Sequence, residues 1–175
     1  MFDRHQPVKL ISLHQPYASL MAVLAKENET RDYKTPYRGQ LVIQAAKESD
    51  FWQTHAHLWN DNPIVHVFRC EHPEAYEALH PATCRMRAVA VTTLTNCLRM
   101  THSPTPSVAE ISIAHVSEAE QAVGLYKPGR YAWTTTDTLY LPEPIKYPGH
   151  QGSVRDASPE LIAEIDRQLN GGAHE

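Results

Sequence analysis

The sequence predicts a single α+β domain built on a small mixed or antiparallel β-barrel with flanking helices. Five or six segments have the pattern of strands, only a few helical segments interrupt them, and the two kinds lack the regular alternation of a doubly wound sheet. The chain has 175 residues, the size of one ordinary domain. No repeat, low-complexity tract or long linker divides residues 1–175.

The N-terminal part predicts a strand, a helix and a second strand. Residues 8–13 form the first strand, and a helix opened by Pro16 follows it directly. A polar loop and the turn signal Tyr37-Arg38-Gly39 then lead to a strand over residues 40–45. Four residues of the helix recur at i, i+3, i+4 and i+7 and predict one apolar face: Tyr17, Leu20, Met21 and Leu24.

The middle of the chain predicts short helices and a buried strand. Residues 48–84 contain the helices, one of them begun by Pro73 with Tyr76 and Leu79 facing inward. The run from Arg87 to Asn96 is rich in Val, Ala, Thr and Leu, which favours a central strand.

The C-terminal part predicts a loop, two strands and two helices. Residues 102–108 form the loop, and Ser117 caps a short helix that ends near Gly124. Strands are expected over residues 130–136 and 138–141. A last helix, at about 158–170, has a cap, a first residue, an apolar stripe and a stop signal: Ser158, Pro159, then Leu161, Ile162, Ile165 and Leu169, then Gly171-Gly172.

Composition excludes several classes of protein. The apolar fraction of 42% and the charged fraction of 21% are typical of a soluble globular domain. The longest apolar stretch, residues 20–25, is too short to span a bilayer, and no secretory signal or disulfide framework is evident, so a cytoplasmic location is expected. The net charge of −4 argues against a broad basic surface for nucleic acid, and glycine-rich phosphate loops are missing.

The segment from Ser12 to Lys47 carries cations interleaved with tyrosines. Positive donors beside aromatic rings suit stacked bases and phosphates. The alternative is a solvated helix end and loop, with Lys26 and Glu29 as a surface pair.

The order of the patterns resembles the ASCH family. Three elements near the N-terminus carry this resemblance: Ser12-Leu13-His14-Gln15-Pro16-Tyr17-Ala18-Ser19-Leu20, then Lys26-x-x-Glu29-x-Arg31, then Thr35-Pro36-Tyr37-Arg38-Gly39. Three later elements are similar to further signatures of the family: Gly129-Arg130-Tyr131-Ala132-Trp133, Pro144-Ile145 and Gly149-x-Gln151-Gly152. Together they span about residues 8–154. Where the family usually has a glycine, two residues before the lysine, this chain has Leu24, which predicts a slightly longer helix.

The resemblance implies a barrel similar to the PUA domain, with a cleft beside the first helix. It also implies binding of RNA or of a nucleoside, with double-stranded DNA a less favoured ligand. We expect a ligand-binding set of His14, Gln15, Tyr17, Lys26, Glu29, Arg31, Tyr37, Arg38, Tyr131 and Trp133. No cofactor is expected. Two roles are open for His14, contact with the ligand or capping of the helix. Two roles are also open for Tyr131 and Trp133, stacking on a base or packing in the core.

Chemistry on the ligand is an alternative function. Some members of the family remove the acetyl group of 4-acetylcytidine, and others cleave RNA. The acetylcytidine hydrolases have a threonine three residues after their lysine, and here Glu29 stands at that position. A variant mechanism would use Lys26 and Glu29, with Glu118, or alternatively Glu120, as a general base.

A metal-stabilised interaction module is the third hypothesis. Cys70, His72, His80 and Cys84 are of residue types that bind zinc. The single residue between Cys70 and His72 is a tighter spacing than in standard zinc modules. Surface histidines and buried thiols are the other reading, so no metal ligand is assigned. The eleven histidines of the chain have no explanation at this point.

Overall fold

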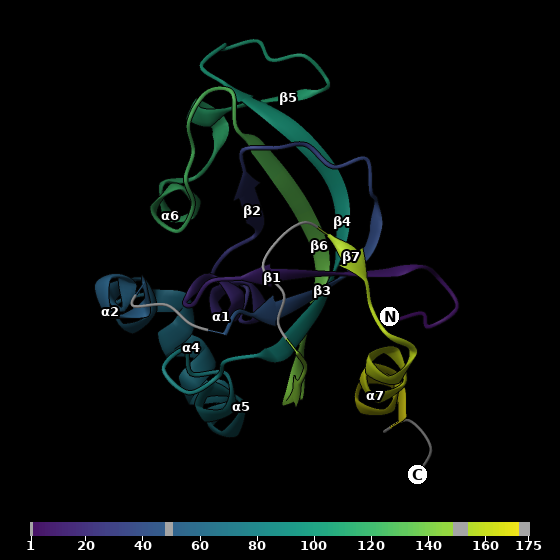
Figure 1. Ribbon diagram of the computed structural model, residues 1–175. Helices are drawn as coiled ribbons and strands as arrows, with labels where there is room; N and C mark the ends of the chain where they lie inside the picture. Colours follow the sequence, from purple (N-terminus) through teal and green to yellow (C-terminus); the bar gives the residue numbers. More distant parts are fainter. Residues whose placement is uncertain (1, 48–50, 149–153, 172–175) are drawn as a thin grey trace.

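The computed structural model of the protein describes residues 2–47, 51–148 and 154–171 (Figure 1). The strands in this part of the chain are β1 (Val8–Leu13), β2 (Asn28–Arg31), β3 (Gly39–Ala45), β4 (Arg87–Thr101), β5 (Glu110–Ser112), β6 (Tyr131–Lys146) and β7 (Arg155–Asp156). The helices are α1 (Tyr17–Ala22), α2 (Phe51–His55), α3 (His57–Asn60), α4 (Pro63–Glu71), α5 (Pro73–Ala78), α6 (Glu118–Ala122) and α7 (Pro159–Asn170), with a 3-10 turn at Ile113–His115.

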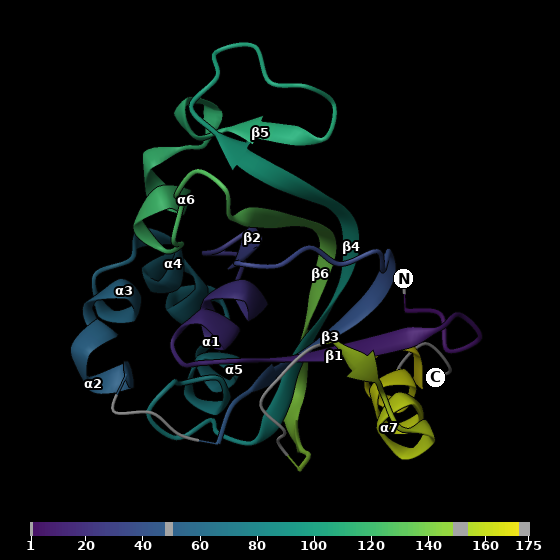
Figure 2. The same ribbon diagram turned by 45° about the horizontal axis from the view of Figure 1, so that its top comes forward.

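The strands form one mixed sheet in the order β2-β6-β4-β3-β1-β7, and β5 pairs with the far part of β4. The β1–β3 and β4–β5 pairs are parallel and the others antiparallel. The sheet curves strongly, as Figure 2 shows, but no pairing among the described strands closes it. The predicted α+β class and mixed, barrel-like sheet are confirmed, with the sheet left open.

The two faces of the sheet bury two separate cores because side chains alternate along a strand. In β1, Ile11 packs in the larger core with α1, while Leu10 packs in a second core with α7. In β3, Ile43 and Val42 divide in the same way. The helices from α1 to α5 therefore lie on one side of the sheet and α7 on the other (Figure 1). This arrangement leaves the edge near β2 and the start of β6 free for the pocket described below.

The helix after β1 is shorter than expected, and its C-terminus shapes the site. It ends at Ala22, and the backbone N–H groups of Ala25 and Lys26 both donate to the Leu20 carbonyl. Leu24 has a φ of 62° and is 55% exposed, so it does not belong to the apolar helix face. The prediction of a longer helix was wrong, because Leu24 adopts the left-handed conformation that a glycine at this position adopts without strain. Pro16 is the residue before the helix, not its first residue.

Other elements differ in length from the predictions. The central strand runs on to Thr101, and the two strands expected over residues 130–136 and 138–141 are one strand, β6, in which Asp137 has a φ of 53°. β2 and β5 had no strand signal of their own. β2 has the polar sequence NETR and is ordered by antiparallel pairing with β6.

The predicted start signals of three helices are confirmed. Ser117 and Ser158 each accept a hydrogen bond from the backbone N–H three residues later, and Pro73 begins α5. Leu161 and Ile165 are buried, whereas Gly172 and the signature Gly149-x-Gln151-Gly152 lie outside the described residues.

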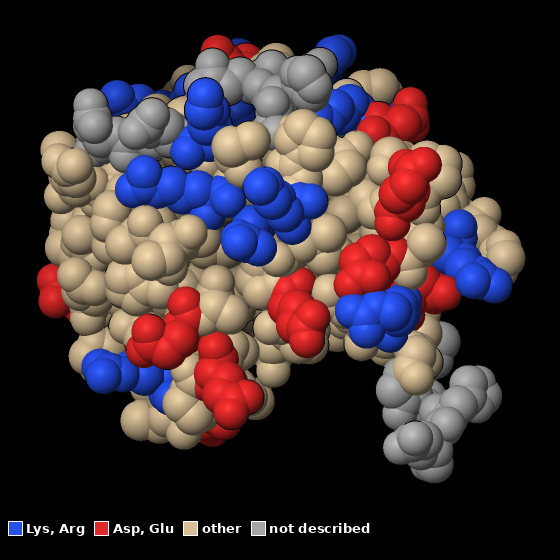
Figure 3. All heavy atoms as spheres, turned by 60° about the horizontal axis from the view of Figure 1, so that its bottom comes forward, with Lys and Arg blue, Asp and Glu red and all other residues tan. Residues whose placement is uncertain are grey.

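Charges of both signs lie on the exterior. Figure 3 shows a face on which Lys and Arg gather in a band across the upper half while most Asp and Glu lie below it. In the described part of the chain, no helix is long and apolar enough to cross a membrane.

Candidate functional site

A pocket of about 340 Å³ opens between β2, the start of β6 and the helices α1 and α2. Its volume is within the range of small-molecule sites. It has two unlike sides, which we call the charged wall (Lys26, Glu29, Arg31 and Arg130) and the aromatic wall (His14, Tyr17, Phe51 and His55). Its other lining residues are Leu13, Thr30, Val123, Gly124 and Leu125.

Lys26 is buried at the base of the charged wall, with 2% of its surface exposed. Its Nζ donates to the Asn28 carbonyl and lies 3.9 Å from a carboxylate oxygen of Glu29 and 3.9 Å from one of Glu120. The ammonium group is also 5.9 Å from the centre of the Tyr17 ring. Burial lowers the pKa of Lys26 from its ordinary value, and the two carboxylates oppose this shift.

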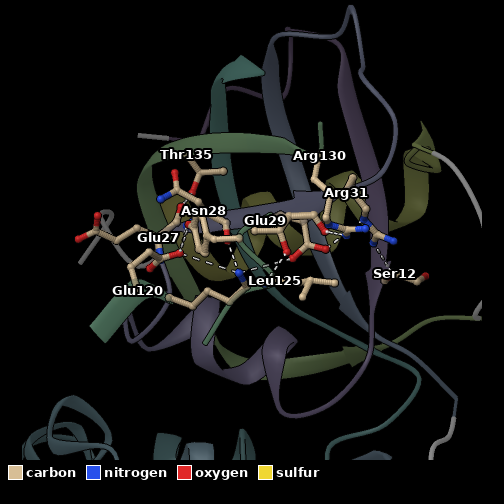
Figure 4. Close-up of polar contacts among 12 residues, drawn as sticks. Ser12, Glu27, Asn28, Glu29, Arg31, Glu120, Leu125, Arg130 and Thr135 are labelled. Atoms are coloured by element: carbon tan, nitrogen blue, oxygen red, sulfur yellow. Dashed lines mark hydrogen bonds and ion pairs between the residues drawn. The ribbon is translucent and has the colours of Figure 1, made fainter. Parts of the chain in front are cut away.

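Glu120, on α6, binds the backbone next to Lys26 and does not line the pocket. Its carboxylate accepts hydrogen bonds from the backbone N–H of Glu27 at 2.8 Å and of Asn28 at 3.0 Å, and from the Tyr126 hydroxyl at 2.9 Å. Burial, followed by the charge of Glu120, raises the pKa of Tyr126. Figure 4 shows Glu120 at one end of this network and Arg31 at the other.

Glu29, which is buried, and Arg31, which is half-buried, continue the charged wall from Lys26. They sit two apart on β2, so their side chains project from the same face of the strand. Arg31 Nε lies 3.0 Å from Glu29 Oε1, and Arg31 Nη2 donates to the Ser12 carbonyl at 3.3 Å. Burial and then the charge of Glu29 raise the pKa of Tyr17, on the opposite wall. The motif Lys-x-x-Glu-x-Arg thus becomes one connected group of charges.

Arg130 completes the charged wall from the residue before β6. Its Nη2 donates to the Thr30 carbonyl at 3.1 Å, which fixes the guanidinium group beside β2. In the sequence, Arg130 stands out only as part of the signature Gly129-Arg130-Tyr131-Ala132-Trp133. Its place in the pocket depends on the pairing of Arg31 with Tyr131 across β2 and β6, which no local pattern reveals.

The aromatic wall is a stack of rings. Phe51 stacks on His55 with ring centres 3.8 Å apart and planes 4° apart, and His14 stacks against Phe51 at 5.7 Å. Tyr17 is tilted by 55° against Phe51. Planar rings on this side and donors and acceptors on the other can hold a flat heterocycle such as a nucleobase. Phe51 and His55 had no sequence signal as site residues.

Three predicted ligand residues serve the fold instead. Gln15 is buried, and its amide donates to Ser19 Oγ and to the Cys84 carbonyl, both at 2.8 Å. The Tyr37 hydroxyl donates to backbone carbonyls, and the Arg38 guanidinium donates to its own loop. None of the three lines the pocket.

Trp133, Tyr131 and Glu118 also lie away from it. Trp133 has no exposed surface and donates to the Tyr33 carbonyl at 3.3 Å, so its ring packs in the larger core and offers no face to the pocket. Tyr131 packs against the larger core. Glu118 is an exposed residue of α6 outside the pocket, and the buried carboxylate of that helix belongs to Glu120.

Several histidines of the pocket and of the helical region pack against other rings. His14, His55, His57, His72 and His80 each lie against another aromatic ring or imidazole. Cys70 is exposed, whereas Cys84 is buried and burial raises the pKa of its thiol to about 11. Over residues 2–47, 51–148 and 154–171, no three metal-ligating side chains come together.

Comparison with known proteins finds similarity among solved structures. No protein-family model matches the chain, and no curated protein matches it. Among solved structures, the chain is similar to a mutant form of the ZmASCH protein from Zymomonas mobilis, with 12% identity over 91% of this chain and 96% of that chain and a TM-score of 0.48. That protein carries the name of the family that the sequence motifs resemble.

Proposed function

We propose that the protein binds RNA or a modified nucleoside by taking one nucleoside-sized unit into the pocket. The observation that carries this proposal is the pairing of the two walls in one cavity of about 340 Å³, with stacked rings facing Lys26, Glu29 and Arg31. Stacking on an aromatic face contributes about 1–3 kcal/mol per base. The cytoplasmic location expected from the sequence stays a prediction.

The two walls have complementary roles in this proposal. A base lies against Tyr17 and the rings around Phe51, while Glu29 accepts a hydrogen bond from an exocyclic amine. Lys26 and Arg31 donate to carbonyl or phosphate oxygens. A duplex fits this arrangement poorly, because its bases are stacked inside the helix and a pocket of this size takes only one extruded unit.

Titration calorimetry with single nucleosides, N4-acetylcytidine and a short single-stranded RNA tests the proposal. Arg31→Gln removes a charged donor from the pocket and is expected to weaken binding at least 10-fold, because a hydrogen bond to a charged group contributes about 1.5–3 kcal/mol. Arg38→Gln is the matched control, since Arg38 donates to carbonyls of its own loop and does not line the pocket. Equal affinity of the wild type and Arg31→Gln for every ligand would contradict the proposal.

Hydrolysis of an acylated nucleoside is a second candidate, favoured by the meeting of a buried amine and a carboxylate. Lys26, as an ammonium, can stabilise the oxyanion that forms when water attacks the acetyl carbonyl of N4-acetylcytidine. Glu29 takes a proton from that water, and the cytosine amine leaves with a proton, so that water and substrate give acetate and cytidine. Thr30 also lines the pocket, but its Oγ1 accepts a hydrogen bond from the Leu125 N–H.

Incubation with N4-acetylcytidine, followed by chromatography of cytidine, tests this candidate. Glu29→Gln is expected to abolish turnover, whereas Glu118→Gln, outside the pocket, is expected to leave it unchanged. The same incubation with a labelled RNA oligonucleotide tests RNA cleavage. Turnover no higher than that of Glu29→Gln with either substrate would leave binding as the function.

A further inference from the structure

The pocket has an excess of positive charge although the protein as a whole is acidic. Its lining contains three cations, Lys26, Arg31 and Arg130, and one carboxylate, Glu29, while the net charge of the chain is −4. Glu120 lies behind Lys26 and reduces the local excess without facing the cavity. A neutral nucleoside gives this excess no partner, so an anionic group is the better match.

The two arginines are held in place by backbone atoms and retain donors for a ligand. Each uses Nη2 to bond a carbonyl, Arg31 that of Ser12 and Arg130 that of Thr30. Within the described residues, Arg130 has no carboxylate within ion-pair distance. Fixing a long side chain in this way removes much of the entropy cost of binding an anion.

Both guanidinium groups also have a buried nitrogen without a hydrogen bond. In the described part of the chain, Arg31 Nε and Arg130 Nε are inaccessible to solvent and make none. Arg31 Nε is close to Glu29 Oε1, but its N–H does not point at that oxygen, and Arg130 Nε has no partner. An unsatisfied buried donor costs about 1–3 kcal/mol, so each guanidinium group is left with a donor that the described part of the protein does not satisfy.

We propose that Arg31 and Arg130 form a phosphomonoester subsite, so that the ligand of the pocket is a nucleoside monophosphate. This inference rests on the proposed function, because the base occupies the aromatic wall described there. A phosphomonoester carries a charge of about −1.5 to −2 at pH 7 and has three acceptor oxygens, which matches the lining better than the single charge of an internal phosphodiester.

Calorimetry with the four common nucleosides and their 5′-monophosphates tests the subsite. For the wild type, the monophosphate of the best nucleoside is expected to bind at least 10-fold more tightly than the nucleoside itself. The ratio is expected to increase from pH 5.5 to 7.5, because the second ionisation of the phosphate has a pKa of about 6. Inorganic phosphate is expected to compete with the monophosphate.

Substitution of Arg130 assigns the preference to a residue. Arg130→Gln is expected to reduce the ratio below 3-fold, and Arg130→Lys to leave it intermediate, because lysine keeps the charge but loses the planar fork. Arg99→Gln, an exposed arginine of β4, is the control and is expected to keep the ratio. Thermal unfolding of each variant checks that it is folded.

The outcomes separate the subsite from the proposed function. Nucleoside binding that depends on Arg31, with no preference for the monophosphate, overturns the subsite and leaves the proposed function intact. A dinucleotide that binds as tightly as the monophosphate overturns the choice of a monoester. Absence of binding by nucleosides, monophosphates and RNA overturns both.

Discussion

The two walls of the pocket differ in what holds them. Lys26 and Glu29 of the charged wall are buried, and Lys26, Glu120 and both arginines bond to backbone atoms of β1, β2 or the turn before β2. The aromatic wall rests partly on α2, a five-residue helix without a buried residue, whose rings are held by stacking. The charged wall is therefore integrated into the buried part of the fold, whereas α2 lies at the surface and buries no residue.

Because of this difference, we expect substitutions in the two walls to affect different quantities, folding stability for one wall and ligand affinity for the other. A change in the charged wall leaves other buried charges without partners and costs folding free energy. A change in α2 exposes or removes a surface ring and costs mainly ligand contact.

Lys26→Met is expected to have the largest effect. It leaves Glu29 and Glu120 buried beside an apolar thioether, and removing one member of a buried ionic group costs about 3–5 kcal/mol. Lys9→Met is the matched control, because Lys9 pairs with Asp156, whose side chain is 82% exposed, and such pairs contribute less than about 1 kcal/mol. Urea unfolding measures both, and similar losses for the two variants would mean that the charged wall is no more structural than the surface.

The pH dependence of that loss sharpens the first prediction. Burial lowers the pKa of Lys26, so in alkaline solution the unfolded chain binds more protons at this residue than the folded protein. The free energy of unfolding that Lys26 contributes therefore increases with pH until the unfolded lysine also titrates, at about 10.4. The gap between the wild type and Lys26→Met is expected to widen from pH 7 to 10. A narrowing gap would mean that the carboxylates outweigh burial and raise the pKa.

Phe51→Ala tests the other wall. The substitution removes the ring that lies between His14 and His55. Ligand affinity is therefore expected to fall about 10-fold, which is within the 1–3 kcal/mol that stacking contributes per base. The free energy of unfolding is expected to change little. Trp52→Ala is the control for binding, because Trp52 packs against His80 and does not line the pocket. Calorimetry with the best ligand and urea unfolding separate the two effects. A Phe51→Ala variant that loses stability but no affinity would reverse the comparison.

The sequence could predict elements that depend on local signals but not those that depend on contacts between distant segments. Strands β1 and β3 and helix α7 were predictable because alternation and capping are local. β2 was not, since its polar residues form a strand only through their pairing with β6. Lys26, Glu29 and Arg31 were predictable as a group because their close spacing in the sequence places them together.

Residues that meet through tertiary structure were missed or misassigned. Arg130 and Phe51 reach the pocket from segments that no spacing connects to Lys26. Gln15 and Trp133 were assigned to the ligand because polar and aromatic residues suit one, but the same properties let Gln15 satisfy buried backbone groups and Trp133 fill a core. Burial, which the sequence does not display, decides between these roles.

The smallest expected effect concerns Leu24, in the turn that positions Lys26. A residue with a side chain pays about 1–2 kcal/mol for the left-handed conformation, and glycine does not. Leu24→Gly is therefore expected to be about 1 kcal/mol more stable than Leu24→Ala. At Ala163, an exposed position within α7, the order is expected to reverse, and Ala163→Gly loses about 1 kcal/mol. If urea unfolding finds Leu24→Ala as stable as Leu24→Gly, the turn before Lys26 is not left-handed, and the charged wall is anchored by its ion pairs and carbonyl bonds alone.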